Sequence, residues 1–362
     1  MDVNFTWVAD EAALSEAVGA CGRIVALDTE FQRTDTFFPI AGLYQLASPD
    51  QIWLIDPLAI EDFGSLVDLL EDPAVTKVMH ACSEDLELFR HHLGTTPRGV
   101  FDTQFAHAYL SDRFSISYSD LVNRITGAEL TSSQTRSNWL RRPLREAQTR
   151  YAAKDVEYLP AIYDNLRDAL ENEGRWAWFQ EDMAERERYD SPDPSIYYRS
   201  VSRAWALPPQ ALARLQSLCA WRERTAMSRD LPRRRVVWDE HLYELAEADR
   251  IDAGDVRKVV PDAVARRYAE ELVTAHGETP EAVESVQKPL TQSEGKVLKD
   301  LRSIGVKVAE ELGVANELLA RKRDLEALFR HFRESRDLDA RHQGWRLPVV
   351  GERYAELLAQ RI

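Results

Sequence analysis

Hydrophobic residues in the first half of the chain follow the two spacings that separate strands from helices. Short apolar runs predict strands at residues 5–8, 24–31, 42–48, 51–56 and 76–80. The turn Ser48-Pro49-Asp50 predicts a hairpin between two of them. Helical spacing predicts helices at residues 10–18, 63–70, 84–93 and, in pieces, 120–170, with Asp10 and Asp102 as helix caps. This order predicts an α/β domain with a mixed sheet and flanking helices.

The second half of the chain has helical spacing and no convincing strand. Proline and serine interrupt the pattern near residues 190–200 and 207–209, which indicates a linker. We therefore expect four parts, namely an α/β domain at 1–190, a linker at 191–209, and all-α helical modules at 210–285 and 291–362. The two modules are similar in length, which is consistent with a diverged tandem repeat.

Composition limits the class of protein. The chain has 362 residues, 44% hydrophobic and 30% charged, typical of a globular protein with two or three domains. No apolar run reaches membrane-spanning length, and the first residues lack a signal-peptide pattern, so we expect a cytoplasmic protein without membrane association. The three widely spaced cysteines predict packing residues rather than disulfides. We expect a monomer.

Charge is distributed unequally along the chain. The net charge is −15, and residues 1–190 hold 17 Lys and Arg against 33 Asp and Glu. Residues 191–362 hold 29 against 28, so the acidity belongs to the first half. A polyanionic substrate is still compatible with this balance, because bound metals and local basic patches set the field where binding occurs.

Two acids follow the apolar run 24–27 at a spacing of two residues. Side chains on a strand alternate between faces, so Asp28 and Glu30 point the same way. Neighbouring carboxylates repel unless a cation lies between them, and hard divalent cations prefer carboxylate oxygens. Taken alone, the pair is more often a strand that ends in a polar turn.

Two further stretches add polar groups. Asp85 follows a predicted strand in the first turn of a helix, where it could simply be a cap. Tyr151 and Asp155 are four residues apart and share one helix face, which is also common for a surface pair. Together, four carboxylates can hold two divalent ions of the kind that assist phosphoryl transfer, and a phenol can orient the attacking water.

The stretches LDTEF, HACSEDLELF and YAAKDVEYL resemble the three motifs of the tyrosine branch of the DEDD 3′–5′ exonucleases. The longer stretch SNWLRRPLREAQTRYAAKDVEYL resembles the ribonuclease D family in particular. Residues 210–276 resemble an HRDC domain, and residues 291–362 resemble a second, diverged HRDC domain. The resemblance implies a ribonuclease H-like fold, with Asp28, Glu30, Asp85 and Asp155 as metal ligands and Tyr151 as the residue that positions water.

The resemblance also implies an activity. We expect a 3′–5′ exoribonuclease that uses two Mg²⁺ or Mn²⁺ ions to release 5′-mononucleotides from structured RNA, with 3′-extended tRNA precursors as the first candidate. A DNA exonuclease and a non-catalytic RNA-binding scaffold remain alternatives, because no residue decides which sugar is accepted.

Basic and aromatic residues suggest where RNA could bind. Six basic residues lie between 131 and 154: Arg136, Arg141, Arg142, Arg145, Arg150 and Lys154. A second group lies in the first helical module: Arg222, Arg224, Arg229, Arg233, Arg234 and Arg235. Both predict backbone contacts, although a solvated arginine-rich surface is the alternative. We interpret Trp221 and Trp238 as core residues and His80 as structural. For Phe31, Phe37, Phe38 and Gln45, core packing competes with a role in the nucleotide pocket.

Overall fold

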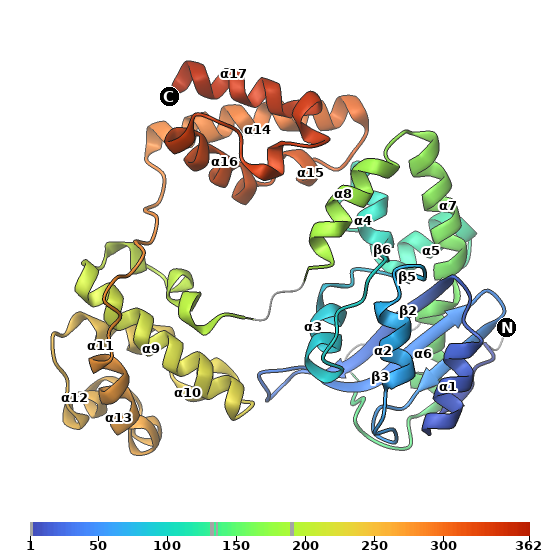
Figure 1. Cartoon of the computed structure of the whole chain (residues 1–362), viewed down its shortest axis with the longest axis horizontal. Coiled ribbons are helices and arrows are strands. Elements are labelled where there is room, and N and C mark those ends of the chain that lie inside the picture. Colours follow the sequence, from blue (N-terminus) through green and yellow to red (C-terminus); the bar gives the residue numbers. More distant parts are fainter. Residues whose placement is uncertain (1–2, 131–133, 135–136, 189–191) are drawn as a thin grey trace. The chain divides into compact units, whose positions relative to one another are not determined.

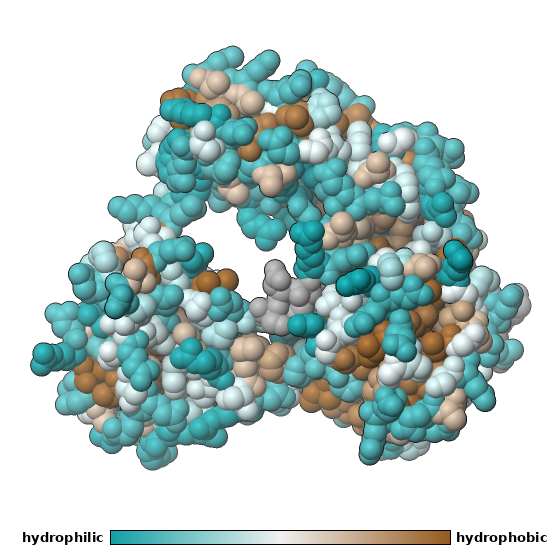
Figure 2. All heavy atoms as spheres, in the orientation of Figure 1, coloured by the Kyte–Doolittle hydropathy of each residue, from teal (hydrophilic) through white to brown (hydrophobic). Residues whose placement is uncertain are grey.

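The computed structural model describes residues 3–130, 134, 137–188 and 192–362 (Figure 1). The chain divides into two compact units. Unit 1 comprises residues 1–32, 41–189 and 290–362, and unit 2 comprises residues 33–40 and 190–289. Hydrophilic residues cover most of the visible face of the molecule (Figure 2), as the charged fraction of 30% leads one to expect.

Unit 1 is built on a six-stranded sheet with the strand order β1-β4-β3-β2-β5-β6. The strands are β1 Thr6–Val8, β2 Ile24–Gln32, β3 Ile40–Ser48, β4 Gln51–Ile55, β5 Thr76–Met79 and β6 Val100–Asp102. β3 and β4 pair antiparallel with Ser48 opposite Gln51, which confirms the predicted hairpin. β1 pairs parallel with β4, and β5 pairs parallel with both β2 and β6. The predicted mixed sheet is therefore confirmed.

Helices surround this sheet. They are α1 Glu11–Gly19, α2 Gly64–Glu71, α3 Ser83–His92, α4 Thr103–Ala108, α5 Tyr118–Thr126, α6 Glu146–Glu157, α7 Leu159–Asn172 and α8 Trp176–Arg186. Asp10 and Asp102 cap α1 and α4 as predicted, because their carboxylates accept backbone N–H groups of the first turn. Gly94, with φ +73°, follows α3 in the left-handed conformation that glycine adopts without strain. Local sequence signals thus placed the helix ends.

The last helices of the chain belong to unit 1. They are α14 Gln292–Leu312, α15 Glu317–Ala320, α16 Lys322–Ser335 and α17 Glu352–Arg361, with short turns at Ala340–His342 and Leu347–Gly351. Their apolar residues join the same hydrophobic core as the sheet and α1–α8. Trp345 stacks on Trp178 of α8, with ring centroids 4.7 Å apart and an interplanar angle of 11°. Residues 290–362 are therefore packed onto the α/β domain.

Unit 2 is helical and has its own core. Its elements are the 3₁₀ turns η1 Pro194–Ser200 and η2 Ala204–Ala206, and the helices α9 Pro209–Ser228, α10 Arg233–Val236, α11 Asp239–Glu247, α12 Ala253–Val259 and α13 Asp262–Gly277. The turn η1 packs against α9. The hydroxyl of Tyr198 in η1 donates to the carbonyl of Glu284 at 2.9 Å. This bond links the segment before α9 to the segment that follows α13.

Candidate active site

The five predicted site residues lie on three elements of unit 1. Asp28 and Glu30 are on β2, Asp85 is in the first turn of α3, and Tyr151 and Asp155 are on α6. Glu30 and Asp85 are buried, and the other three are half-buried. α6 packs against β2, and β2 pairs with β5, which leads into α3. The fold therefore brings the three stretches together.

The pKa values of the four carboxyl groups show their mutual proximity. Burial raises the pKa of Asp28 well above its ordinary value, and the charges of Asp85, Asp155 and Glu30 raise it further. Burial, Asp155 and Asp85 raise the pKa of Glu30 to about 9. A carboxylate that is buried among other carboxylates favours its protonated form. In their ionised form the four acids repel one another, and a bound cation would relieve that repulsion.

Hydrogen bonds moderate this effect at two of the acids. Burial raises the pKa of Asp85 to about 6, while hydrogen bonds from the Thr29 hydroxyl and from the backbone N–H of Asp85 act in the opposite direction. Burial raises the pKa of Asp155 to about 7, and the hydrogen bond with Tyr151 opposes it. Thr29 lies between the two acids of the first motif, and sequence reasoning missed its contact because Asp85 is remote in the chain.

Tyr151 is positioned by its ring and by its hydroxyl. Its ring packs against the fully buried ring of Trp139, with centroids 6.3 Å apart, and its hydroxyl is hydrogen-bonded to the Asp155 carboxylate. Burial raises the pKa of Tyr151, and the charges of Asp155 and Glu30 raise it further. The hydroxyl therefore stays protonated at neutral pH and acts as a hydrogen-bond donor.

The donor set fits a divalent cation in its chemistry. Four carboxylates are the ligands that Mg²⁺ and Mn²⁺ prefer, and an ion bound among them would favour their ionised form against the burial that raises their pKa values. In the described part of the chain, no group of three or more His, Cys, Asp or Glu side chains is arranged so that it could hold a metal ion as it stands.

The loop before Asp85 is held by a second buried acid. Ala81 has φ +59°, a left-handed conformation unusual for a residue other than glycine. Its backbone N–H donates to Asp102 Oδ1 at 3.0 Å, and Arg186 contacts Asp102 Oδ2 at 3.3 Å. Asp102 thus caps α4 and also fixes the turn that leads to Asp85. The cap was predictable from sequence, but the contact with Ala81 was not.

His80 is structural, as predicted. Its ring nitrogens lie 2.9 Å from Thr103 Oγ1 and 3.1 Å from the carbonyl oxygen of Ile116, so both are occupied. Burial lowers the pKa of His80. The ring is therefore a neutral packing element next to the site.

The aromatic candidates are packing residues. Phe31 packs against the core of unit 1, and Phe37 and Phe38 belong to the core of unit 2. Gln45 is fully buried in β3, and its amide has no hydrogen-bond partner among the described residues. The three phenylalanines therefore support the core-packing alternative.

The basic run before α6 is largely engaged within the protein. Arg142 makes a bidentate contact with Asp56 and also donates to the carbonyls of Gly42 and Trp139, so it clamps the loop to the sheet. Arg150 pairs with Glu146, and Lys154 pairs with Glu157. Arg141 and Arg145 are exposed and pair with no acid in the described structure, while Arg136 lies outside the described residues. Of the basic residues predicted to contact phosphates, Arg141 and Arg145 therefore remain without an acidic partner in the described structure.

The arginine group of unit 2 is also mostly internal, which corrects the prediction of a six-residue capture surface. Arg222 is 1% exposed and pairs with Glu223 and Asp239. Arg233 pairs with Glu223, Arg229 with Glu271, and Arg235 with Asp35. Arg224 and Arg234 are exposed and pair with no acid in the part of the chain that the structure describes. The sequence could not reveal these pairings because several partners are distant in the chain.

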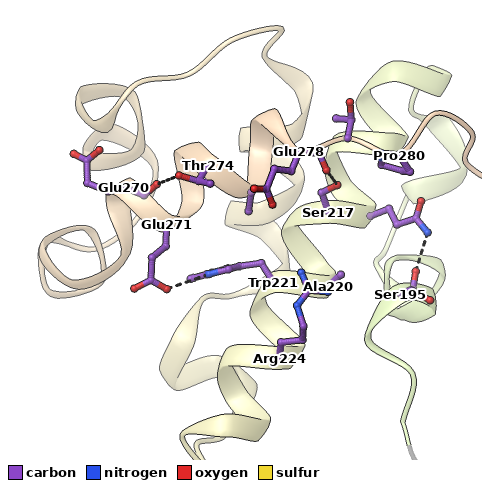
Figure 3. Close-up of a pocket in the computed structure, with 13 residues that line it drawn as sticks. Ser195, Ser217, Ala220, Trp221, Arg224, Glu270, Glu271, Thr274, Glu278 and Pro280 are labelled. Carbon is purple, nitrogen blue, oxygen red and sulfur yellow. Dashed lines mark hydrogen bonds between the residues drawn. The ribbon is translucent and has the colours of Figure 1, made fainter.

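The two tryptophans of unit 2 differ from each other. Trp238 is 46% exposed, with the guanidinium of Arg234 lying 5.2 Å from its ring centroid, so the prediction of a core residue is wrong there. Trp221 is half-buried against Tyr268, and its Nε1 donates to Glu271 at 3.1 Å (Figure 3). It lines a cavity of about 560 Å³ that also contains Arg224 and the acids Glu270, Glu271 and Glu278. Because carboxylates outnumber the cation, this cavity is unfavourable for RNA phosphates.

Comparisons with known proteins match this chain over most of its length. The 3′–5′ exonuclease family matches residues 5–171, and the HRDC domain family matches residues 211–275. Ribonuclease D of Pseudomonas paraeruginosa is 41% identical over 359 residues, which cover 96% of this chain and 95% of that protein. Ribonuclease D of Escherichia coli is 33% identical over 362 residues, which cover 96% of each chain.

A solved structure gives the same result. The crystal structure of E. coli RNase D, described as an exoribonuclease involved in structured RNA processing, matches with a TM-score of 0.89 and 32% identity and covers 99% of both chains. In addition, no helix within the described ranges is both long and apolar enough to cross a membrane.

Proposed function

Because the chain belongs to the ribonuclease D family of 3′–5′ exoribonucleases, we propose that it trims the 3′ ends of structured RNA precursors, with 3′-extended tRNA as the first substrate. Each cycle releases a 5′-mononucleotide. The observation that carries the proposal is the convergence of four buried or half-buried carboxylates with raised pKa values. Membership in this family sets aside the non-catalytic scaffold.

We assign the metal sites to the four carboxylates. Asp28, Glu30, Asp85 and Asp155 would hold two divalent cations, Mg²⁺ or Mn²⁺. When bound, such ions lower the pKa of the attacking water and stabilise the leaving 3′ oxygen. Thr29 orients Asp85 through its hydroxyl, and Tyr151 orients Asp155 in the same way.

Tyr151 has the positioning role in this mechanism. Its hydroxyl lies next to the Asp155 carboxylate, and its raised pKa makes it a poor base at neutral pH. It therefore directs the attacking water by hydrogen bonding rather than by removing its proton. Because hydrolysis uses water directly, the mechanism contains no covalent enzyme intermediate.

We also propose the domain limits and the setting. The exonuclease domain spans 1–190, a linker spans 191–209, the first HRDC domain spans 210–285, and a second, diverged HRDC-like domain spans 291–362. The match of the HRDC family to residues 211–275 supports the first HRDC limit. We propose a cytoplasmic monomer that acts on RNA.

The test is incubation of the full chain with 3′-extended tRNA in Mg²⁺, in Mn²⁺, or in chelator. We expect mononucleotides in either metal and none in chelator. A sequence-matched DNA strand in parallel separates the exoribonuclease from the DNA exonuclease alternative. Release of oligonucleotides instead of mononucleotides would contradict the proposed reaction.

A further inference from the structure

A cavity of about 600 Å³ in unit 1 gathers three arginines that are far apart in the sequence. Arg90 comes from α3, Arg98 from the loop before β6, and Arg188 from the residues that follow α8. All three side chains are exposed. This concentration of positive charge stands out because residues 1–190 carry 33 acids against 17 basic residues.

The two acids of this cavity are occupied by donors from the protein. Glu71 accepts the hydroxyl of Thr95 at 2.5 Å, and Glu187 accepts the backbone N–H of Val100 at 2.7 Å. In contrast, the side chains of Arg98 and Arg188 form no hydrogen bond or ion pair in the described structure, and Arg90 donates to the carbonyl of Gly94 at 3.1 Å. With three arginines and two glutamates the cavity has a net positive charge, and the guanidinium groups of Arg98 and Arg188 can donate to a ligand.

The cavity and the active site lie at opposite ends of the same strands. Asp85 follows the carboxyl end of β5, whereas the cavity residues Pro73 and Gly99 precede the amino ends of β5 and β6. Helix α3 spans this separation, because it begins next to Asp85 and carries Arg90 near its end. The four residues of β5, which lie between the cavity end and Asp85, correspond to about 13 Å at the usual rise per strand residue. A ligand in the cavity thus stays clear of the reacting atoms but lies within reach of a folded RNA.

We propose that this cavity binds backbone phosphates of structured RNA, away from the 3′ end that is being trimmed. The inference depends on the family's RNA substrate and is independent of which residues hold the metal. Exposed guanidinium groups bind phosphate oxygens through paired N–H donors and give affinity without reading sequence. The cavity then anchors the body of the RNA while α3 leads to the catalytic acids.

The test compares the double variant Arg98→Gln/Arg188→Gln with the control Arg23→Gln/Arg302→Gln. The control arginines are also exposed, belong to unit 1 and do not line the cavity. Binding of 3′-extended tRNA is measured in chelator over a series of salt concentrations, so the readout does not depend on catalysis. Each phosphate contact contributes roughly 0.7–0.9 to the slope of log affinity against log salt.

We expect weaker RNA binding in the cavity variant, with the slope reduced by roughly 1–2, and wild-type behaviour in the control. Single-turnover cleavage of a dinucleotide in Mg²⁺ should equal wild type, because its single phosphodiester lies at the catalytic acids and leaves no phosphate for the cavity. An unchanged slope, an equal loss in the control, or an equal loss on the dinucleotide would overturn the proposal. Inorganic phosphate is titrated in parallel, and a cavity that binds it without contributing to RNA affinity would also overturn it. If the wild-type protein showed no nuclease activity, the proposed function would be refuted. The binding test would still be valid, because it is made in chelator.

Discussion

Asp182 and Arg346 form a buried, bidentate ion pair that joins α8 to the last helices of unit 1. Arg346 Nη1 lies 2.7 Å from Asp182 Oδ1, and Nη2 bonds the other oxygen. The two side chains are 5% and 2% exposed. Asp182 also accepts hydrogen bonds from the Tyr109 hydroxyl and from Trp345 Nε1. Residues 290–362 are thus bonded to the exonuclease domain.

Arg346→Met should destabilise unit 1. Removing one partner of a buried pair leaves an uncompensated charge, which typically costs about 3–5 kcal/mol. Denaturant unfolding followed by tryptophan fluorescence measures the change. Arg361→Met is the control, because Arg361 pairs with Asp300 at the surface, where such a pair contributes about 1 kcal/mol or less. Equal effects of the two changes would show that residues 290–362 are not held by this pair.

The metal-free protein should lose stability as pH rises. Glu30 holds its proton in the folded chain up to about pH 9, whereas the unfolded chain releases it near its ordinary pKa of 4.5. The folded state is therefore disfavoured progressively between these two values. One pKa unit corresponds to about 1.4 kcal/mol, so the decline due to Glu30 is on the order of a few kcal/mol.

Urea unfolding in chelator at a series of pH values tests this prediction. Glu30→Gln should flatten the decline, and the exposed control Glu16→Gln should keep it. Addition of Mg²⁺ should restore stability at high pH more in wild type than in Glu30→Gln. If stability declined equally in Glu30→Gln, the pH dependence would not come from Glu30.

Tyr151→Phe should lower turnover with little effect on binding. The change keeps the ring against Trp139 and removes only the hydroxyl that bonds Asp155. We expect single-turnover cleavage to fall by about 10²-fold or more, the usual size of a lost positioning contact. Metal titration and RNA affinity on the same preparation should match wild type. Unchanged single-turnover cleavage would show that the Tyr151 hydroxyl has no positioning role and that the residue only packs.

The arginines of unit 2 should separate into two classes. Arg234→Gln should weaken binding of structured RNA and leave the unfolding midpoint unchanged, because this side chain is exposed and pairs with no acid in the described residues. Arg222→Met should unfold unit 2 more easily, since it leaves the buried Glu223 with Arg233 alone. Circular dichroism and salt-dependent RNA binding distinguish the two effects. Reduced RNA binding by a stable Arg222→Met variant would contradict this division.

Local spacing in the sequence determined the elements that carry the site. The alternation that put Asp28 and Glu30 on one strand, the hairpin between Ser48 and Gln51, and the Asp102 cap all depend on residues within a few positions of one another. The spacing of Tyr151 and Asp155 likewise predicted that they share one helix face, where they are hydrogen-bonded to each other. Backbone geometry fixes such relationships, because side-chain direction repeats with a period of two in strands and 3.6 in helices.

Only the tertiary structure decided which distant groups meet. Arg142 forms an ion pair with Asp56, and Arg222 forms one with Asp239 inside unit 2. From the sequence, both had been predicted to contact phosphates. Arg90, Arg98 and Arg188 gave no motif at all, yet they line one cavity. Nothing in the sequence of residues 290–362 indicated that Arg346 would reach Asp182 in the core of unit 1. Whether a charge faces solvent, a partner or a ligand depends on packing between elements, and residue type and local spacing do not encode that packing.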